Sequence, residues 1–286
     1  MELHHLDIKL ARAATLPILP TVVSQVIALA DNPAAGPRDF ERVIARDAGL
    51  SAKILRTANS SYYGGDGKIV NLQKALSKLG CNTIRSICIT VAFQSSISGK
   101  ALNKTFNLTQ FWQHSLAVGC AAKVLAMLAH DPHAEEAFIA GLLHDIGKLA
   151  MAMFLSDEAT MVYNLMRDRD ICQFDAEKDC LGVTHQEIGA LVAHHWNLPE
   201  LYVPSIGRHH DPINDDGSFD KINLYVHVGN VLAHLAGLGY SPISTTYSAD
   251  PAVLDELHIP AAQLEAVESA VAVEVSKLSQ HMGLVA

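Results

Sequence analysis

Several histidines and one aspartate recur in this chain in a pattern that could hold a divalent metal ion. The residues are His114, the adjacent pair His144 and Asp145, His185, and the adjacent pair His209 and His210. Imidazole and carboxylate groups together suit Fe, Mn, Zn or Ni, and a bridging carboxylate can help two such ions to activate water against a phosphate ester. The pattern predicts a centre with one or two such ions. If the centre is catalytic, Asp145 would orient the water and Lys148 would stabilise developing charge.

The pair His144-Asp145 lies inside an unusually apolar segment, Ala137–Leu155. Its strongly polar side chains are His144, Asp145 and Lys148 alone. As one continuous helix the segment would be buried on nearly all sides, and a buried carboxylate is costly unless it is paired or bound to a metal. An ion pair between Asp145 and Lys148, three residues apart, is the simpler alternative to a metal site.

The elements that must position these residues are helices. Apolar residues recur at helical spacing along the chain. The expected helices cover residues 22–30, 40–44, 50–58, 75–79, 84–93, 111–128, 135–155, 157–169, 186–196, 202–209, 222–238 and 261–278, with loops at 211–219 and 241–251. Because no strand alternation is found, the sequence predicts an all-α fold. The polar stretch 98–107 divides it into subdomains over residues 1–105 and 106–286.

The bulk composition narrows the classes of partner. The net charge of −9 argues against nonspecific nucleic-acid binding, which needs a basic face. The five cysteines are odd in number and form no C-x-x-C pair, which is typical of reduced thiols in a cytoplasmic protein. The N-terminus has no apolar signal core. Asp145 and Lys148 would each cost about 2.5 to 3.5 kcal/mol in a membrane, so we expect a buried helix there and no membrane partner.

Not every histidine fits the pattern. His194 lies nine residues after His185, so on a continuous helix it points to the opposite side. We expect His194 and His195 to lie at the surface or behind the ligands.

The chain resembles the HDOD domain, a divergent branch of the HD-type metal-dependent phosphohydrolases related to the HD-GYP proteins. The resemblance runs from about Leu16 to about Leu238. It rests on the motifs at Leu16–Pro20, Leu50–Ser60, Ala75–Gly80, Trp112–Ser115, Ala137–Gly147, His185–Gly189, Trp196–Pro199 and His209–His210. It implies a multi-helix HD-like bundle and a role in bacterial signal transduction.

The resemblance also implies which residues bind metal. The six positions that bind two metals in HD hydrolases keep ligand-type side chains here. Two acidic positions of that pattern are amides, Gln110 and Asn230. Each amide removes a negative charge from a site for divalent cations, so one metal, or a strong site beside a weak one, is expected. The GYP signature is absent, because Asp211-Pro212-Ile213-Asn214 follows the histidine pair.

Three functions remain open at this stage. The first is a regulatory HDOD protein without turnover, which acts by binding a signalling protein or a phosphorylated small ligand. The second is an active phosphodiesterase that uses a metal-activated water. The third is a metal that only stabilises the fold. The stripe of apolar residues along 261–278 could pack on its own domain or on a second copy in a homodimer.

Overall fold

The structure is a computed structural model, and it describes residues 21–30, 32, 34–59, 69–97, 102–196, 198–238 and 248–282. The predictions on Leu16–Pro20, on Ser60, on residues 98–101 and on residues 241–247 of the expected loop lie outside these residues. Within them the chain forms helices, with one isolated β-bridge between Ile213 and Phe219. The prediction of an all-α fold is confirmed.

The chain divides into two compact units, one within Lys100–Val275 and the other within Pro17–Gly99, with residues from Ser276 onward counted with the second. The point of division lies among residues outside the described ones, so the predicted boundary at 98–107 stays a prediction. Each unit is described by itself.

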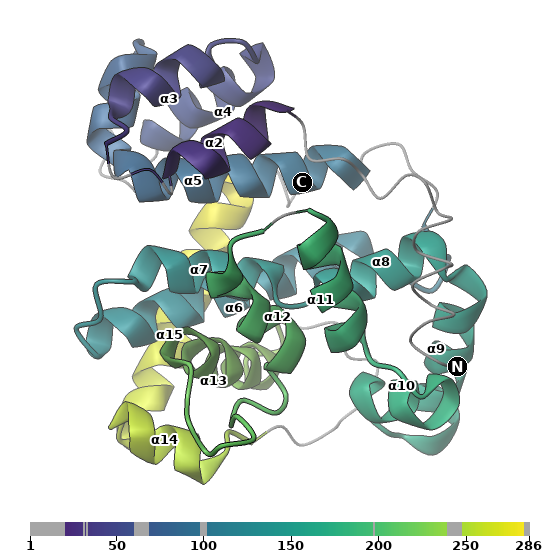
Figure 1. Cartoon of the computed structure of the whole chain (residues 1–286). Coiled ribbons are helices and arrows are strands. Elements are labelled where there is room, and N and C mark those ends of the chain that lie inside the picture. The colour runs from purple at the N-terminus through teal and green to yellow at the C-terminus, as the bar shows by residue number, and fades with distance from the viewer. Residues whose placement is uncertain are drawn as a thin grey trace. The chain divides into compact units, whose positions relative to one another are not determined.

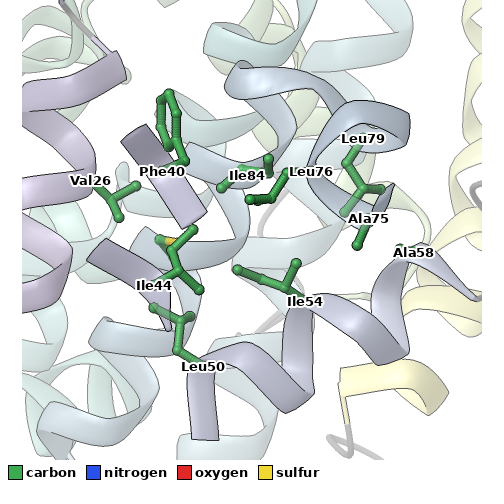
Figure 2. Close-up of a cluster of buried hydrophobic side chains, with 11 residues drawn as sticks. Val26, Phe40, Ile44, Leu50, Ile54, Ala58, Ala75, Leu76, Leu79 and Ile84 are labelled. Atoms are coloured by element: carbon green, nitrogen blue, oxygen red, sulfur yellow. The ribbon is translucent and has the colours of Figure 1, made fainter. Parts of the chain in front are cut away.

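The smaller unit contains α2 (Thr21–Ala30), α3 (Pro37–Ile44), α4 (Ala48–Ala58) and α5 (Leu72–Ile97). Asp47 caps α4 by accepting a hydrogen bond from the backbone N–H of Leu50. The side chains of Phe40, Ile44 and Ile54 are buried at the centre of its apolar core (Figure 2). The sequence predicts a helix end at Gly80, and the structure has a kink there with φ of +78°, where two helical segments meet within α5.

The larger unit contains the remaining helices (Figure 1). They are α6 (Leu108–Leu128), α7 (Ala134–Leu143), α8 (Ile146–Phe154), α9 (Ser156–Arg169), α10 (Gln173–Leu181), α11 (His185–His195), the 3₁₀ helix η2 (Glu200–Tyr202), α12 (Val203–Arg208), α13 (Lys221–Leu235), α14 (Pro251–Leu257) and the part of α15 (Ala261–Met282) up to Val275. Helices α6, α7 and α13 pack against one another, and α8 packs against α11. The sequence did not predict α10 or α14, because neither carries a continuous apolar stripe.

The expectation of one helix through Ala137–Leu155 is wrong at its centre. Helix α7 ends at Leu143 and α8 begins at Ile146, so His144 and Asp145 form the turn between them. Asp145 occupies the N-cap position of α8, but its carboxylate makes no capping bond. The physical reason is that this carboxylate points at the histidines instead. The break frees two adjacent side chains to face the same point.

The apolar stretch Ala134–Phe154 is, within the described residues, the one helical stretch long and apolar enough to cross a membrane. Of the apolar 18-residue window within it, 78% is buried inside the protein, as in the core helix of a soluble protein. All five cysteines are free thiols.

Candidate metal centre

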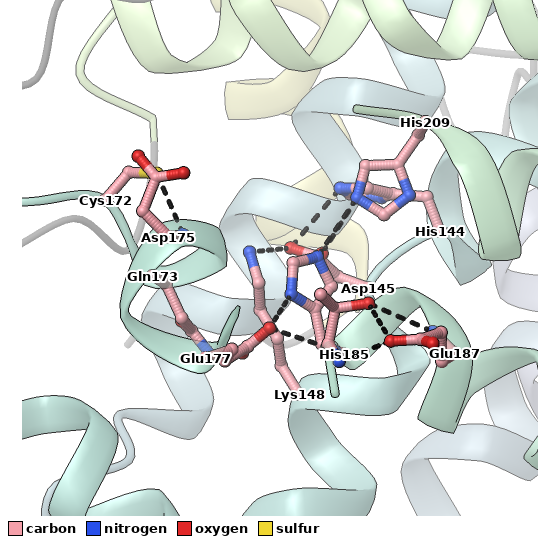
Figure 3. Close-up of polar contacts among 11 residues, drawn as sticks. His144, Asp145, Lys148, Cys172, Gln173, Asp175, Glu177, His185, Glu187 and His209 are labelled. Atoms are coloured by element: carbon pink, nitrogen blue, oxygen red, sulfur yellow. Dashed lines mark hydrogen bonds and ion pairs between the residues drawn. The ribbon is translucent and has the colours of Figure 1, made fainter. Parts of the chain in front are cut away.

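Five elements of the larger unit bring the predicted ligands together. His114 comes from α6, and His144 and Asp145 from the turn between α7 and α8. His185 is the first residue of α11, where Thr184 caps the helix. His209 and His210 follow α12 directly. The side chains of His144, Asp145, His185 and His209 are buried together (Figure 3).

The histidines surround the two oxygens of Asp145. The Nε2 atoms of His114 and His144 lie 3.6 Å and 3.3 Å from its Oδ2. On the other side, the Nε2 atoms of His185 and His209 lie 3.4 Å and 3.5 Å from its Oδ1. Asp145 therefore lies between two pairs of imidazoles, which define two halves of the centre. Its two oxygens face one half each.

Each of these four imidazoles is held through its other ring nitrogen. The Nδ1 atoms of His114, His144 and His209 face the backbone carbonyls of Leu238, Gly141 and Ser205 at 3.1, 2.7 and 2.9 Å. A carbonyl only accepts, so each Nδ1 carries a proton, and each Nε2 is the ring nitrogen that faces Asp145. Anchoring of this kind is what orients metal-binding histidines.

His185 is anchored by a carboxylate that sequence reasoning missed. Glu177 of α10 is fully buried, and its Oε2 accepts from the Nδ1–H and the backbone N–H of His185 at 2.6 and 2.7 Å. Gln173 donates to the other carboxylate oxygen at 2.7 Å. Glu177 is thus satisfied at both oxygens, and it makes the His185 ring more electron-rich than a backbone carbonyl would.

His210 completes one of the two groups that could hold an ion. The donor atoms of His185, His209 and His210 form one such group, and those of His114, His144 and Asp145 form the other. Phe174 of α10 packs on the His210 ring at a centroid distance of 4.7 Å. The Gln186 amide, oriented with its oxygen toward the loop, accepts from the backbone N–H of His209 and His210 at 2.8 and 2.9 Å.

The donor set fits a metal ion. Within the described residues, the Nε2 atoms of His114, His144 and His210 and the Oδ1 of Asp145 are buried without a hydrogen-bond partner. Such groups are costly in a protein interior. The Nε2 atoms of His185 and His209 lie 3.2 Å apart, a separation that needs a proton or a metal ion between them. A divalent cation would satisfy the donor atoms of the group that binds it.

The electrostatics keep Asp145 charged and several imidazoles neutral. Burial raises the pKa of Asp145, but the neighbouring His144 and Lys148 outweigh it and hold this pKa well below its usual range. Burial lowers the pKa of His114 to about 3, and lowers the pKa of His209 and His210 well below the usual range. Neutral imidazole is the form that binds metal.

These pKa shifts predict that the metal-free protein loses stability in acid. The unfolded histidines bind protons below about pH 6.5, whereas the folded His114 stays neutral down to a pKa of about 3. Stability therefore falls as the pH drops through that window. At one pH unit below 6.5, each imidazole that the fold keeps neutral lowers the free energy of unfolding by about 1.4 kcal/mol. Urea unfolding in a chelator, compared at about pH 7.5 and about pH 5.5, measures the loss. An unchanged midpoint would contradict the buried neutral cluster.

The two amides that replace acidic residues, Gln110 and Asn230, differ in burial. Gln110 is exposed on the first turn of α6, and its backbone N–H bonds to Asn107. Asn230 of α13 is buried, and its Oδ1 has no hydrogen-bond partner within the described residues. The structure therefore buries Asn230, which lines a cavity together with His210, and leaves Gln110 exposed. His194 and His195 are exposed, as expected.

A cavity of about 350 Å³ lies beside the centre. Its lining includes Lys148, His210 and Asn230 on the side of the centre, and Gln173 and Phe174 at the start of α10. Its volume is within the range of pockets that take small ligands.

Two histidines of α13, His227 and His234, also lie near the centre, and sequence reasoning did not single them out. His234 packs on His114 at a centroid distance of 4.6 Å, and burial lowers its pKa to about 2. His227 faces the carbonyl of His209 through Nδ1 at 2.8 Å and accepts from the backbone N–H of Asp250 through Nε2. Both line the cavity. Their spacing of seven residues, with Asn230 between them, puts them on one face of the helix, and this polar stripe could have been found.

The fold and this centre define an all-α protein with a buried cluster of histidines around one aspartate. The sequence model of the HDOD domain family matches residues 16–212. The chain belongs to the HDOD domain family.

Known proteins are similar to it in sequence or in fold. A protein of Treponema pallidum, described only as uncharacterized, is 25% identical over 202 residues, which cover 70% of this chain and 38% of that protein. The chain thus spans well under two thirds of that relative's length.

Solved structures with similar folds have slightly lower identity. An HDOD domain protein of unknown function from Geobacter sulfurreducens has a TM-score of 0.71 at 22% identity, covering 94% of this chain and 98% of that one. A protein from Shewanella amazonensis, provisionally assigned as a phosphohydrolase, has a TM-score of 0.74 at 22% identity, covering 97% and 98%. One from Marinobacter aquaeolei, provisionally assigned to signal transduction, has a TM-score of 0.80 at 23% identity, covering 96% and 61%. At these identities the likeness shows the fold alone.

Proposed function

We propose that this HDOD protein is a cytoplasmic regulatory protein that holds a divalent metal and binds a signalling protein or a phosphorylated small ligand without turnover. The observation that carries the proposal is the charge of the centre. Within the described residues, Asp145 is the one carboxylate against the Nε2 atoms, and the Lys148 ammonium lies 2.7 Å from its Oδ2. A metal held by few anionic protein groups keeps free coordination positions and excess positive charge, and an anionic bound molecule can supply both the ligands and the negative charge.

The cavity beside the centre supports an anionic ligand. Lys148 contributes a positive charge to its lining, and His210, Asn230 and His234 contribute neutral polar groups. The one carboxylate among the described lining residues, Asp175, is hydrogen-bonded to the Cys172 thiol at 3.1 Å. When bound, a divalent cation would supply Lewis-acid attraction for phosphate oxygens and would lower the pKa of a nearby water. Lys148 would stabilise the same oxygens directly.

A test compares the purified protein with a double variant, His144→Ala/Asp145→Ala, at matched metal supply. We expect no metal-dependent hydrolysis of a simple phosphodiester above that of the double variant. We also expect inorganic phosphate to bind the metal-loaded protein but not the double variant, measured by calorimetry. Loss of bound metal in a chelator with no change in phosphate binding would favour a purely structural ion, whose removal lowers thermal stability.

The second candidate is a phosphodiesterase, and the position of the cavity favours it. A ligand in this cavity would contact Lys148 and His210 at the same time. A metal-dependent rate that disappears in the double variant would establish this function in place of the first.

A further inference from the structure

The two oxygens of Asp145 have different surroundings. Oδ2, which faces His114 and His144, is bound by the Lys148 ammonium at 2.7 Å. Oδ1, which faces His185 and His209, has no hydrogen-bond partner within the described residues. One half of the centre therefore already holds a positive charge, whereas the other half presents an unsatisfied carboxylate oxygen.

The groups that anchor the histidines also favour metal binding in the half with His185 and His209. His114 and His144 are anchored by the neutral carbonyls of Leu238 and Gly141. His185 is anchored by the buried carboxylate of Glu177. A carboxylate behind a histidine strengthens its binding to a metal, and loss of such a partner typically costs 10- to 100-fold in affinity.

Lys148 is held where it lies. Its side chain is only 11% exposed, and the backbone N–H of the same residue donates to the Asp145 carbonyl at 2.9 Å. An ammonium this close to Oδ2 would repel a second cation bound by His114 and His144. The lysine therefore gives this half the charge that a second metal would otherwise bring.

From these two differences we infer that the centre holds a single metal ion, bound by Asp145 Oδ1, His185, His209 and His210, and that Lys148 acts as a built-in cation in the other half. The inference rests on the proposed function, since it takes the centre to bind metal, and it names which half does so. Glu177 is the positioning residue for that ion. His114 and His144 lie in the half that the Lys148 ammonium occupies, with their Nε2 atoms 3.6 Å and 3.3 Å from Asp145 Oδ2.

Metal stoichiometry tests this inference without any activity. The protein is stripped with a chelator, titrated with Co²⁺ and followed by visible absorption, with elemental analysis of the loaded protein. We expect about one ion per chain in the wild type and about two in Lys148→Met, where removal of the ammonium opens the second half. Glu177→Gln, which preserves shape, should weaken binding 10- to 100-fold.

Two matched variants locate the ion. His144 and His209 are both fully buried, both anchored to a backbone carbonyl, and both 3.3 to 3.5 Å from Asp145. We expect His209→Ala to lose the ion and His144→Ala to keep it, with circular dichroism to verify that both fold.

The outcomes separate this inference from the proposed function. No bound metal in the wild type would overturn the proposed function. Two ions in the wild type, one ion in folded Lys148→Met, or equal losses in His144→Ala and His209→Ala would overturn only the single-ion assignment.

Discussion

Gly147→Ala should destabilise the protein by about 3 kcal/mol or more and reduce its metal content. Helices α8 and α11 approach so closely at this point that a Cβ on Gly147 would collide with the carbonyl oxygen of His185, and would lie 2.8 Å from the backbone nitrogen of Gly189. These are backbone atoms, which cannot rotate away. The two helices must separate, and His185 moves with α11 away from Asp145.

Gly207→Ala is the matched control for that variant. Gly207 also lies in a helix, α12, but an added Cβ would meet only the Ala190 side chain at an ordinary 3.7 Å. Alanine is the better helix former by about 1 kcal/mol, so we expect this variant to be neutral or slightly more stable. Urea unfolding of both variants in a chelator gives the comparison. Equal stability of the two would contradict the close approach of α8 and α11.

Much of the fold could be predicted from the sequence, because its helices carry their own signals. The end of a helix at Gly80 and the helices around His114 and His185 follow from apolar spacing and turn residues. The break at His144 and Asp145 could not be predicted. The flanking residues are apolar on both sides, so spacing alone favours one helix there. The turn is explained by tertiary contacts of the Asp145 carboxylate, which faces the histidines and pairs with Lys148.

The sequence predicted the residues that come together at the centre, but not the groups that hold them. A buried carboxylate in an apolar segment indicates that partners exist, and the resemblance to HD proteins named them. Glu177 was missed because α10 has no apolar stripe and its link to His185 is a tertiary contact across eight residues. The carbonyls of Gly141, Ser205 and Leu238 carry no side-chain signal at all.

Asp145→Asn should be the most damaging exchange of a single polar group. It removes the one carboxylate that the described part of the chain places among the Nε2 atoms, so we expect the bound metal to be lost. In the metal-free protein it also removes the negative charge 2.7 Å from the Lys148 ammonium, whose side chain is only 11% exposed. Removing one member of a buried ion pair typically costs about 3 to 5 kcal/mol. Urea unfolding in a chelator measures this part without the metal.

Asp168→Asn is the control for the loss of one negative charge. Asp168 is 63% exposed and pairs with its neighbour Arg167 at 3.0 Å. Solvent screens such a pair, so we expect a change within about 0.5 kcal/mol and an unchanged metal content. Asp145→Asn differs from it in burial and in partners, since Asp145 faces four imidazoles and an ammonium. If the two variants were equally stable without metal, Lys148 would not depend on Asp145, and the charge argument for a single metal ion would lose its basis.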